Sequence, residues 1–243
     1  MTSSRLRATT ALLASGVAGA LLLVCTACSA GVATAPIADA TTTADVTVAP
    51  MAATSTAPRT IVTIGDSIMA GFGLDDPSQA WPALLAAATG DTVVNLGCSG
   101  AGFVVAGDCG TDYAGLIDQA VAAQPDLVIV QSSDNDMDET QATLDAATAS
   151  TVTALREALP NARIVGLNTL WNPTFDDPAA ITWSSDALRA AVTDAGGDFV
   201  SIGQPLQGRD DLLQWDLEHP DPAGQIVLCD AIQQALTDAG ILL

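Results

Sequence analysis

Three side chains in this sequence are of the types that perform nucleophilic catalysis. Ser67 follows an apolar run and closes a Gly-Asp-Ser segment at residues 65–67. A serine hydroxyl is a weak nucleophile until a base takes its proton, and the chain contains a single histidine, His219. Asp216 lies three residues earlier, where its carboxylate could accept the imidazole Nδ1–H and stabilise the imidazolium. The spacing therefore predicts a triad of Ser67, His219 and Asp216.

Simpler interpretations of these residues stay open at this point. Gly-Asp-Ser is also a common turn and helix-cap sequence, and His219 before Pro220 could be a surface residue that caps a helix. Glu218 is a second candidate to orient His219, but adjacent side chains usually diverge in direction, which favours Asp216. The nucleophile elbow of α/β-hydrolases is excluded, because Met69 stands where that motif requires its second glycine.

Acyl transfer also needs hydrogen-bond donors for the oxyanion that forms on the substrate. The backbone N–H of Ser67 is one candidate. The Gly-rich segment at residues 95–100 could bring a glycine N–H close to the substrate, and Asn135 could add a side-chain amide. Each of these, taken separately, is more often a turn residue than a catalytic donor.

The elements that must position these groups follow an α/β pattern, in which short apolar runs alternate with longer helical segments. Continuous apolar runs suit strands that are buried on both faces of a parallel sheet. The alternation predicts a three-layer α/β/α sandwich with a five-stranded parallel sheet, which binds ligands at the carboxyl ends of its strands. We predict strands at Ile61–Ile64, Thr92–Leu96, Leu127–Val130, Ile164–Leu167 and Phe199–Ile202.

Helix signals lie between and after these strands. Asp76-Pro77 and Asp221-Pro222 each place a capping residue before a proline at the first helical position. The first pair predicts a helix that continues through Ala83–Ala88. Apolar side chains at spacings of three or four predict two further buried helix faces, one with Leu144, Thr148, Val152, Leu155 and Leu159 and one with Leu228, Ile232 and Leu236.

The polar segments resemble the four sequence blocks of the SGNH, or GDSL, hydrolase family, in that family's order. The blocks correspond to residues 65–68, 93–100, 133–136 and 216–220, and the resemblance extends from about Thr60 to the C-terminus. It implies a serine ester hydrolase with the flavodoxin-like SGNH hydrolase fold.

The resemblance also assigns roles to individual residues. Ser67, Asp216 and His219 match the catalytic triad of the family. The oxyanion donors would be the backbone N–H groups of Ser67 and Gly100 and the side-chain amide of Asn135.

Two positions depart from the family pattern near the oxyanion site. Ser133 stands where the third block normally has a glycine, two residues before Asn135, and it adds a Cβ there. Asp134 adds a negative charge if it is ionised. Both could reshape the acyl pocket or weaken oxyanion stabilisation, whereas Ile68 in place of the usual leucine is nearly isosteric.

The charge balance restricts the substrate. The chain has 28 acidic and seven basic residues and a formal net charge of −21. Such a surface should repel nucleic acid, anionic lipid headgroups and polyanionic glycans, which leaves neutral small esters or glycan esters as better substrates. An acidic surface that only keeps an exported protein soluble is the simpler interpretation. We expect no cofactor and no metal, because one histidine cannot build the usual multi-histidine sites, and we expect a monomer.

The amino terminus has the features of an export signal. Arg5 and Arg7 precede an apolar stretch at residues 11–24 that is short for a membrane span. Small residues before Cys28 resemble a bacterial lipobox, although Cys25 stands where that pattern prefers leucine. Lipidation of Cys28 would make a cell-surface lipoprotein whose only membrane contact is this anchor. Ordinary cleavage nearby would release a secreted protein.

The sequence thus divides into three parts. Residues 1–28 are the expected signal peptide, residues 29–58 an Ala/Thr-rich disordered tether, and residues 59–243 the hydrolase domain. Export would expose cysteines to an oxidising compartment, so we predict a disulfide between Cys98 and Cys109, which share one Gly-rich loop.

Three functions remain to be distinguished. The leading hypothesis is hydrolysis of a carboxylic ester through an acyl-Ser67 intermediate, with a short acyl ester, an acetylated glycan or a lysolipid as substrate. The second is acyl transfer to a sugar in the same site. The third is a non-catalytic glycan- or lipid-binding lipoprotein on the same fold.

Overall fold

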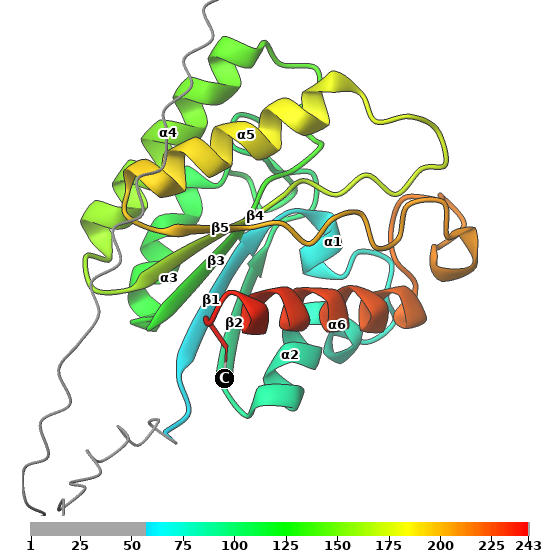
Figure 1. Cartoon of the computed structure of the whole chain (residues 1–243), viewed down its shortest axis with the longest axis horizontal. Helices are drawn as coiled ribbons and strands as arrows, with labels where there is room; N and C mark the ends of the chain where they lie inside the picture. The colour runs from blue at the N-terminus through cyan, green and yellow to red at the C-terminus, as the bar shows by residue number, and fades with distance from the viewer. Residues whose placement is uncertain (1–56, 243) are drawn as a thin grey trace, which may run out of the picture. The chain divides into compact units, whose positions relative to one another are not determined.

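A five-stranded parallel sheet lies at the centre of the computed structural model, which describes residues 57–242 (Figure 1). Its strands are β1 (Thr60–Gly65), β2 (Thr92–Gly97), β3 (Leu127–Gln131), β4 (Arg163–Leu167) and β5 (Asp198–Val200). Their order is β2-β1-β3-β4-β5, and every neighbouring pair is parallel. The α/β class and the five strands that the sequence predicted are confirmed. The expected signal peptide and nearly all of the expected tether lie outside the described residues.

Helices cover both faces of the sheet and complete three layers (Figure 1). The helices α2 (Trp81–Thr89) and α6 (Pro222–Asp238) pack on one face, and α3 (Ile117–Ala123), α4 (Gln141–Ala158) and α5 (Ala179–Asp194) pack on the other. Successive side chains of a strand point to opposite faces. Ile61 and Val62 of β1 accordingly belong to two separate buried clusters, one under each helix layer.

Two of the predicted helix faces are buried as expected. Asp221 caps α6 by accepting a hydrogen bond from the Gly224 N–H at 2.8 Å. The faces consist of Leu228, Ile232 and Leu236 in α6, and of Leu144, Thr148, Val152 and Leu155 in α4, all fully or almost fully buried. Within residues 57–242, no helix combines the length and the apolar character that crossing a membrane requires.

The start of α2 differs from the prediction. Asp76 caps only a 3-10 turn at Pro77–Gln79, and Ala80 is extended before the helix begins at Trp81. The Trp81 N–H donates to Gln225 Oε1 at 2.9 Å, so a residue of α6 caps α2 from a position 144 residues away in the chain. A tertiary contact of this kind leaves no local sequence signal.

The two edge strands are less regular than the central ones. β2 is partly exposed along its length, because only one of its sides has a neighbouring strand. β5 ends at Val200, two residues before the predicted end. Asn168 explains this, since its Oδ1 accepts from the Ile202 N–H at 2.7 Å and its Nδ2 donates to the Gly203 carbonyl at 2.9 Å. The Asn168 side chain thus makes the hydrogen bonds that a neighbouring strand would otherwise make with residues 202 and 203.

Candidate active site

The candidate nucleophile lies where β1 ends and the short helix α1 (Ser67–Ala70) begins. Asp66 caps this helix by accepting from the Ile68 N–H at 2.9 Å. Gly71 ends the helix in the left-handed region, with φ of 79°. Ser67 is therefore the first residue of a tight turn at the carboxyl edge of the sheet, where parallel sheets bind ligands.

The structure brings the three predicted triad residues into one continuous hydrogen-bonded chain. His219 Nε2 lies 2.9 Å from Ser67 Oγ, and His219 Nδ1 lies 2.8 Å from Asp216 Oδ2. The other carboxylate oxygen of Asp216 accepts the backbone N–H groups of Glu218 at 3.1 Å and His219 at 3.0 Å. Burial acts to raise the pKa of Asp216, but the hydrogen bonds from His219 outweigh it and hold the pKa below its usual value. Asp216 therefore stays ionised beside the imidazole.

A compact loop at residues 212–221 presents Asp216 and His219. The Gln214 N–H donates to the His219 carbonyl at 2.8 Å, and Leu217 adopts a positive φ of 59° at the tip. Leu213 and Pro220 form an antiparallel bridge at its base. The loop closes on itself, which fixes the separation of the carboxylate and the imidazole.

Two residues that the sequence analysis did not single out join this loop to the nucleophile segment. The Gln214 side-chain amide donates to the Phe72 carbonyl at 2.6 Å and to the Pro220 carbonyl at 3.0 Å. The Phe72 ring lies against His219, with 4.6 Å between ring centroids. No local motif indicates these contacts, because Gln214 and Phe72 are 142 residues apart in the chain.

Two sets of contacts hold the loop that follows β2 and carries Gly100. The disulfide between Cys98 and Cys109 closes it, with the two Cα atoms 5.8 Å apart. The buried carboxylate of Asp136 accepts the consecutive backbone N–H groups of Phe103, Val104 and Val105 at 2.7, 3.1 and 3.0 Å.

These contacts give Asp136 a structural role that its position in the third block did not suggest. Burial raises its pKa, although the three N–H donors act against that shift. A Cβ on Gly102 would collide with the Asp136 carboxylate, so a glycine is needed at this close approach. The carboxylate thus fixes the backbone just after Gly100, which itself lies in the left-handed region with φ of 76°.

Asn135 lies beside this same loop. Its side-chain Nδ2 donates to the Ala101 carbonyl at 3.1 Å and to Ser133 Oγ at 2.8 Å. Ser133 Oγ also accepts the Asn135 backbone N–H at 3.1 Å. The structure therefore packs the third block against the second, directly next to Gly100. It also places the hydroxyl of Ser133 within hydrogen-bond distance of Asn135, the predicted oxyanion donor.

Asp134 is the second departure from the family pattern, and its charge depends on pH. Burial, together with the nearby carboxylates of Asp66 and Glu218, raises the pKa of Asp134 to about 7. The residue is therefore largely uncharged in mildly acidic solution and becomes negative above neutrality. Its charge opposes a developing oxyanion less than an ordinary aspartate would.

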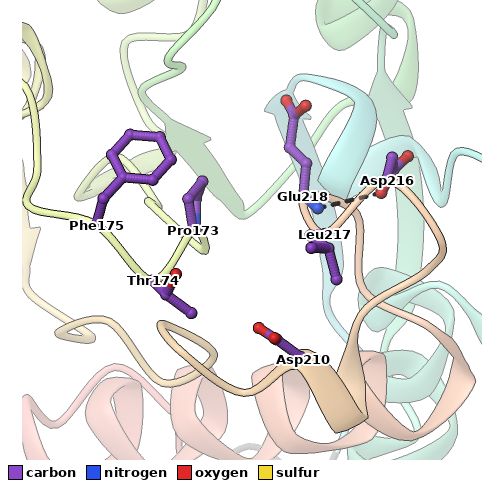
Figure 2. Close-up of a pocket in the computed structure, with 7 residues that line it drawn as sticks. All are labelled: Pro173, Thr174, Phe175, Asp210, Asp216, Leu217 and Glu218. Carbon is purple, nitrogen blue, oxygen red and sulfur yellow. Dashed lines mark hydrogen bonds between the residues drawn. The ribbon is translucent and has the colours of Figure 1, made fainter.

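A cavity of about 360 Å³ adjoins the triad on the Asp216 side (Figure 2). In the figure, Phe175 and Pro173 face Leu217 and Glu218 across the opening. The Phe175 ring packs edge-on against Trp171, with 5.2 Å between the ring centroids. The lining residues are Pro173, Thr174, Phe175, Asp210, Asp216, Leu217 and Glu218, a mixture of apolar surface and carboxylates.

Solved structures share this fold. The crystal structure of TesA is 27% identical and has a TM-score of 0.60, with 74% of this chain and 99% of that chain covered. A carbohydrate esterase family 2 enzyme with a carbohydrate binding domain, from Corynascus thermopiles (Myceliophthora fergusii), is 25% identical with a TM-score of 0.58, covering 74% of this chain and 67% of that one. The psychrotrophic esterase EstA from Pseudoalteromonas sp. is 18% identical with a TM-score of 0.58, covering 74% and 98%.

A family model extends this likeness to the sequence. No curated protein matches the chain significantly. Residues 63–226 match the model of the GDSL-like lipase/acylhydrolase family, a range that contains all three triad candidates, Gly100 and Asn135. This match identifies the protein as a carboxylic ester hydrolase, and the chain belongs to the GDSL-like lipase/acylhydrolase family.

Proposed function

We propose that the protein hydrolyses carboxylic esters through an acyl-Ser67 intermediate. The observation that carries this proposal is the unbroken chain of hydrogen bonds from Ser67 Oγ through His219 to Asp216. His219 Nε2 takes the Ser67 proton as Oγ attacks the ester carbonyl, and the carbonyl electrons move onto oxygen. His219 then returns the proton to the departing alcohol, and the acyl group stays on Ser67.

Deacylation repeats these steps with water. His219 takes a proton from water, the hydroxide attacks the acyl carbon, and the proton returns to Ser67 Oγ as the acid leaves. Both halves pass through a tetrahedral oxyanion. The Ser67 and Gly100 N–H groups and the Asn135 amide are its proposed donors.

The alcohol part of the substrate is proposed to be neutral and rich in hydroxyl groups, as in an acetylated glycan. Phe175, which lines the cavity, is 61% exposed, and Trp215, the residue before Asp216, is 90% exposed; exposed aromatic rings of this kind can bind the C–H faces of sugars. The carboxylates of Asp210 and Glu218 in the cavity lining can accept hydrogen bonds from sugar hydroxyl groups. The same carboxylates and the net charge of −21 disfavour the phosphate of a lysolipid. The 25% identity to a carbohydrate esterase is consistent with this class.

Labelling with a fluorophosphonate tests the acyl-serine mechanism directly. We expect one equivalent of label on the peptide that contains Ser67, and none after Ser67→Ala. Substrate class is tested by comparing release of acetate from acetylated xylan with release of fatty acid from lysophosphatidylcholine. Absence of labelling would reject catalysis by Ser67 and favour a binding protein, whereas preferential lysolipid cleavage would reject the glycan substrate. Faster product formation with an added sugar acceptor would indicate acyl transfer.

We also propose that the protein is exported and lipidated on Cys28. The Arg5 and Arg7 pair before an apolar stretch supports export, and the Cys98–Cys109 disulfide suits an oxidising compartment. Mass spectrometry of the mature amino terminus should find a diacylated Cys28, and Cys28→Ser should move the protein from the membrane fraction to the medium. A mature terminus elsewhere in freely secreted wild-type protein would reject lipidation.

A further inference from the structure

The side-chain amide of Asn135 has both of its hydrogens engaged in this structure. One is donated to the Ala101 carbonyl at 3.1 Å and the other to Ser133 Oγ at 2.8 Å. A primary amide nitrogen carries only two hydrogens. An oxyanion can therefore receive a full hydrogen bond from Asn135 only when one of these two acceptors gives up its bond.

Of the two acceptors, Ser133 Oγ loses its hydrogen bond from the Asn135 amide at the lower energetic cost. Ala101 is fully buried and belongs to the loop that the disulfide and Asp136 hold, so its carbonyl would be left buried without a partner. Ser133 Oγ keeps the Asn135 backbone N–H, at 3.1 Å, as a second donor. Release of the amide hydrogen from Ser133 thus leaves no unpaired group.

The Ser133 hydroxyl oxygen acts as the acceptor toward Asn135. Both of its contacts there, with the side-chain Nδ2 at 2.8 Å and with the backbone N at 3.1 Å, are with N–H groups, which can only donate. The lone pairs of Ser133 Oγ therefore face the Asn135 amide.

We propose that the Ser133 hydroxyl occupies the oxyanion-donating hydrogen of Asn135 in the resting enzyme and so weakens oxyanion stabilisation. Each attack on an acyl carbon exchanges the Asn135–Ser133 hydrogen bond for an Asn135–oxyanion bond. Ser133 is in this sense a positioning residue that acts through Asn135. This inference rests on the proposed roles of Ser67 and Asn135, and it assigns a rate-limiting influence to the side chain that replaces the family's glycine.

Removal of the hydroxyl alone tests the exchange. Ser133→Ala keeps the Cβ and deletes only the competing acceptor. A net hydrogen bond to a neutral group corresponds to a factor of about five to ten. We therefore expect kcat for p-nitrophenyl acetate to rise by about five-fold, with KM changed less than about two-fold. In the Asn135→Ala background the same substitution should have no effect on kcat.

Ser184→Ala is the matched control. Ser184 is also buried, and its Oγ donates to the Ser133 carbonyl at 3.2 Å without contacting Asn135. Its loss removes a neighbouring hydroxyl but leaves both Asn135 amide bonds, so kcat should stay at the wild-type value. An unchanged or lower kcat in Ser133→Ala would overturn the inference, as would a gain that persists in the Asn135→Ala background.

A measurement on the wild-type protein keeps the inference testable if Ser133→Ala does not fold. NMR can follow the Asn135 side-chain amide, assigned by its loss in Asn135→Ala, before and after Ser67 is phosphonylated. We expect one amide hydrogen to shift downfield in the adduct while the Ala101 carbonyl resonance stays in place. Complete labelling with no response from Asn135 would reject this inference together with the donor role of Asn135, and would leave the acyl-Ser67 mechanism standing. Failure of Ser67 to react would instead count against the proposed mechanism.

Discussion

The two sides of the candidate site differ in how ready they are for chemistry. On the C-terminal side, the loop at residues 212–221 already holds His219 against Ser67 and Asp216 with the hydrogen bonds that proton transfer uses. On the strand-end side, the side-chain amide of Asn135, the proposed oxyanion donor, is hydrogen-bonded to Ser133 Oγ of the protein itself. The geometry for the proposed activation of Ser67 is thus preorganised, whereas the proposed oxyanion donor Asn135 already has an internal partner. On the inference above, we expect the rate to depend on Asn135 and Ser133 as well as on the triad.

The largest expected effect comes from breaking the preorganised side. Ser67→Ala and His219→Ala should each lower kcat for p-nitrophenyl acetate by at least about 10⁴-fold, because no other imidazole in the chain can serve as the base. Far-UV circular dichroism should show that both variants stay folded. Wild-type turnover by either purified variant would refute the triad.

The second effect measures the competing side. Asn135→Ala removes a side-chain donor and leaves Ser67 and His219 in place. Loss of one oxyanion donor typically lowers kcat by about 100- to 1000-fold. We expect a decrease in this range, reduced toward its lower limit by the competition with Ser133, and a smaller change in KM. A wild-type kcat for Asn135→Ala in steady-state kinetics would show that the third block is only a turn here.

A third substitution weakens the hydrogen bonds that hold the loop after Gly100, and it leaves the proposed oxyanion donors unchanged. Asp136→Asn weakens the acceptor of three consecutive N–H groups, and hydrogen bonds to charged groups contribute about 1.5–3 kcal/mol each. We expect the free energy of unfolding to fall by about 2 kcal/mol and kcat to fall about ten-fold. Urea denaturation and steady-state kinetics measure the two effects. Asp138→Asn, at an exposed neighbouring position, is the control and should change neither.

The smallest expected effect concerns the negative charge of the Asp134 carboxylate. The pKa of Asp134 is about 7 in the folded protein, above its ordinary value of 3.8. The folded state therefore binds more protons than the unfolded state between these values, and the contribution of Asp134 to stability declines as pH rises from about 4 to 7. Asp134→Asn removes this decline, so it should raise Tm by a few degrees more at pH 8 than at pH 5. Equal shifts at both pH values in calorimetry would contradict the assignment.

The sequence predicted those features that depend on local patterns. The five strands follow from apolar runs, and Ser67, Asn135 and the Gly100 segment fall at strand ends, which meet at one edge of a parallel sheet. Asp216 and His219 share one short loop, so their pairing could also be anticipated. Their catalytic roles stay predictions until the experiments above are done.

Features that depend on contacts between distant segments could not be predicted. The start of α2 depends on Gln225, 144 residues away, and the premature end of β5 depends on the side chain of Asn168. Asp136 was visible in the third block, but its three backbone donors lie more than 30 residues earlier in the chain. The full use of the Asn135 hydrogens likewise requires the geometry of two loops, even though the unusual Ser133 was a signal of something changed there.

The Gln214 amide, which bridges the carbonyls of Phe72 and Pro220, has a consequence for biosynthesis. During translation, the segment with Ser67 is made 152 residues before His219, the proposed base. A nascent chain therefore carries a serine without a base. On the proposed mechanism, we expect Ser67 to gain reactivity toward esters only after the loop at residues 212–221 has docked against the Phe72 segment, where Gln214 joins the two.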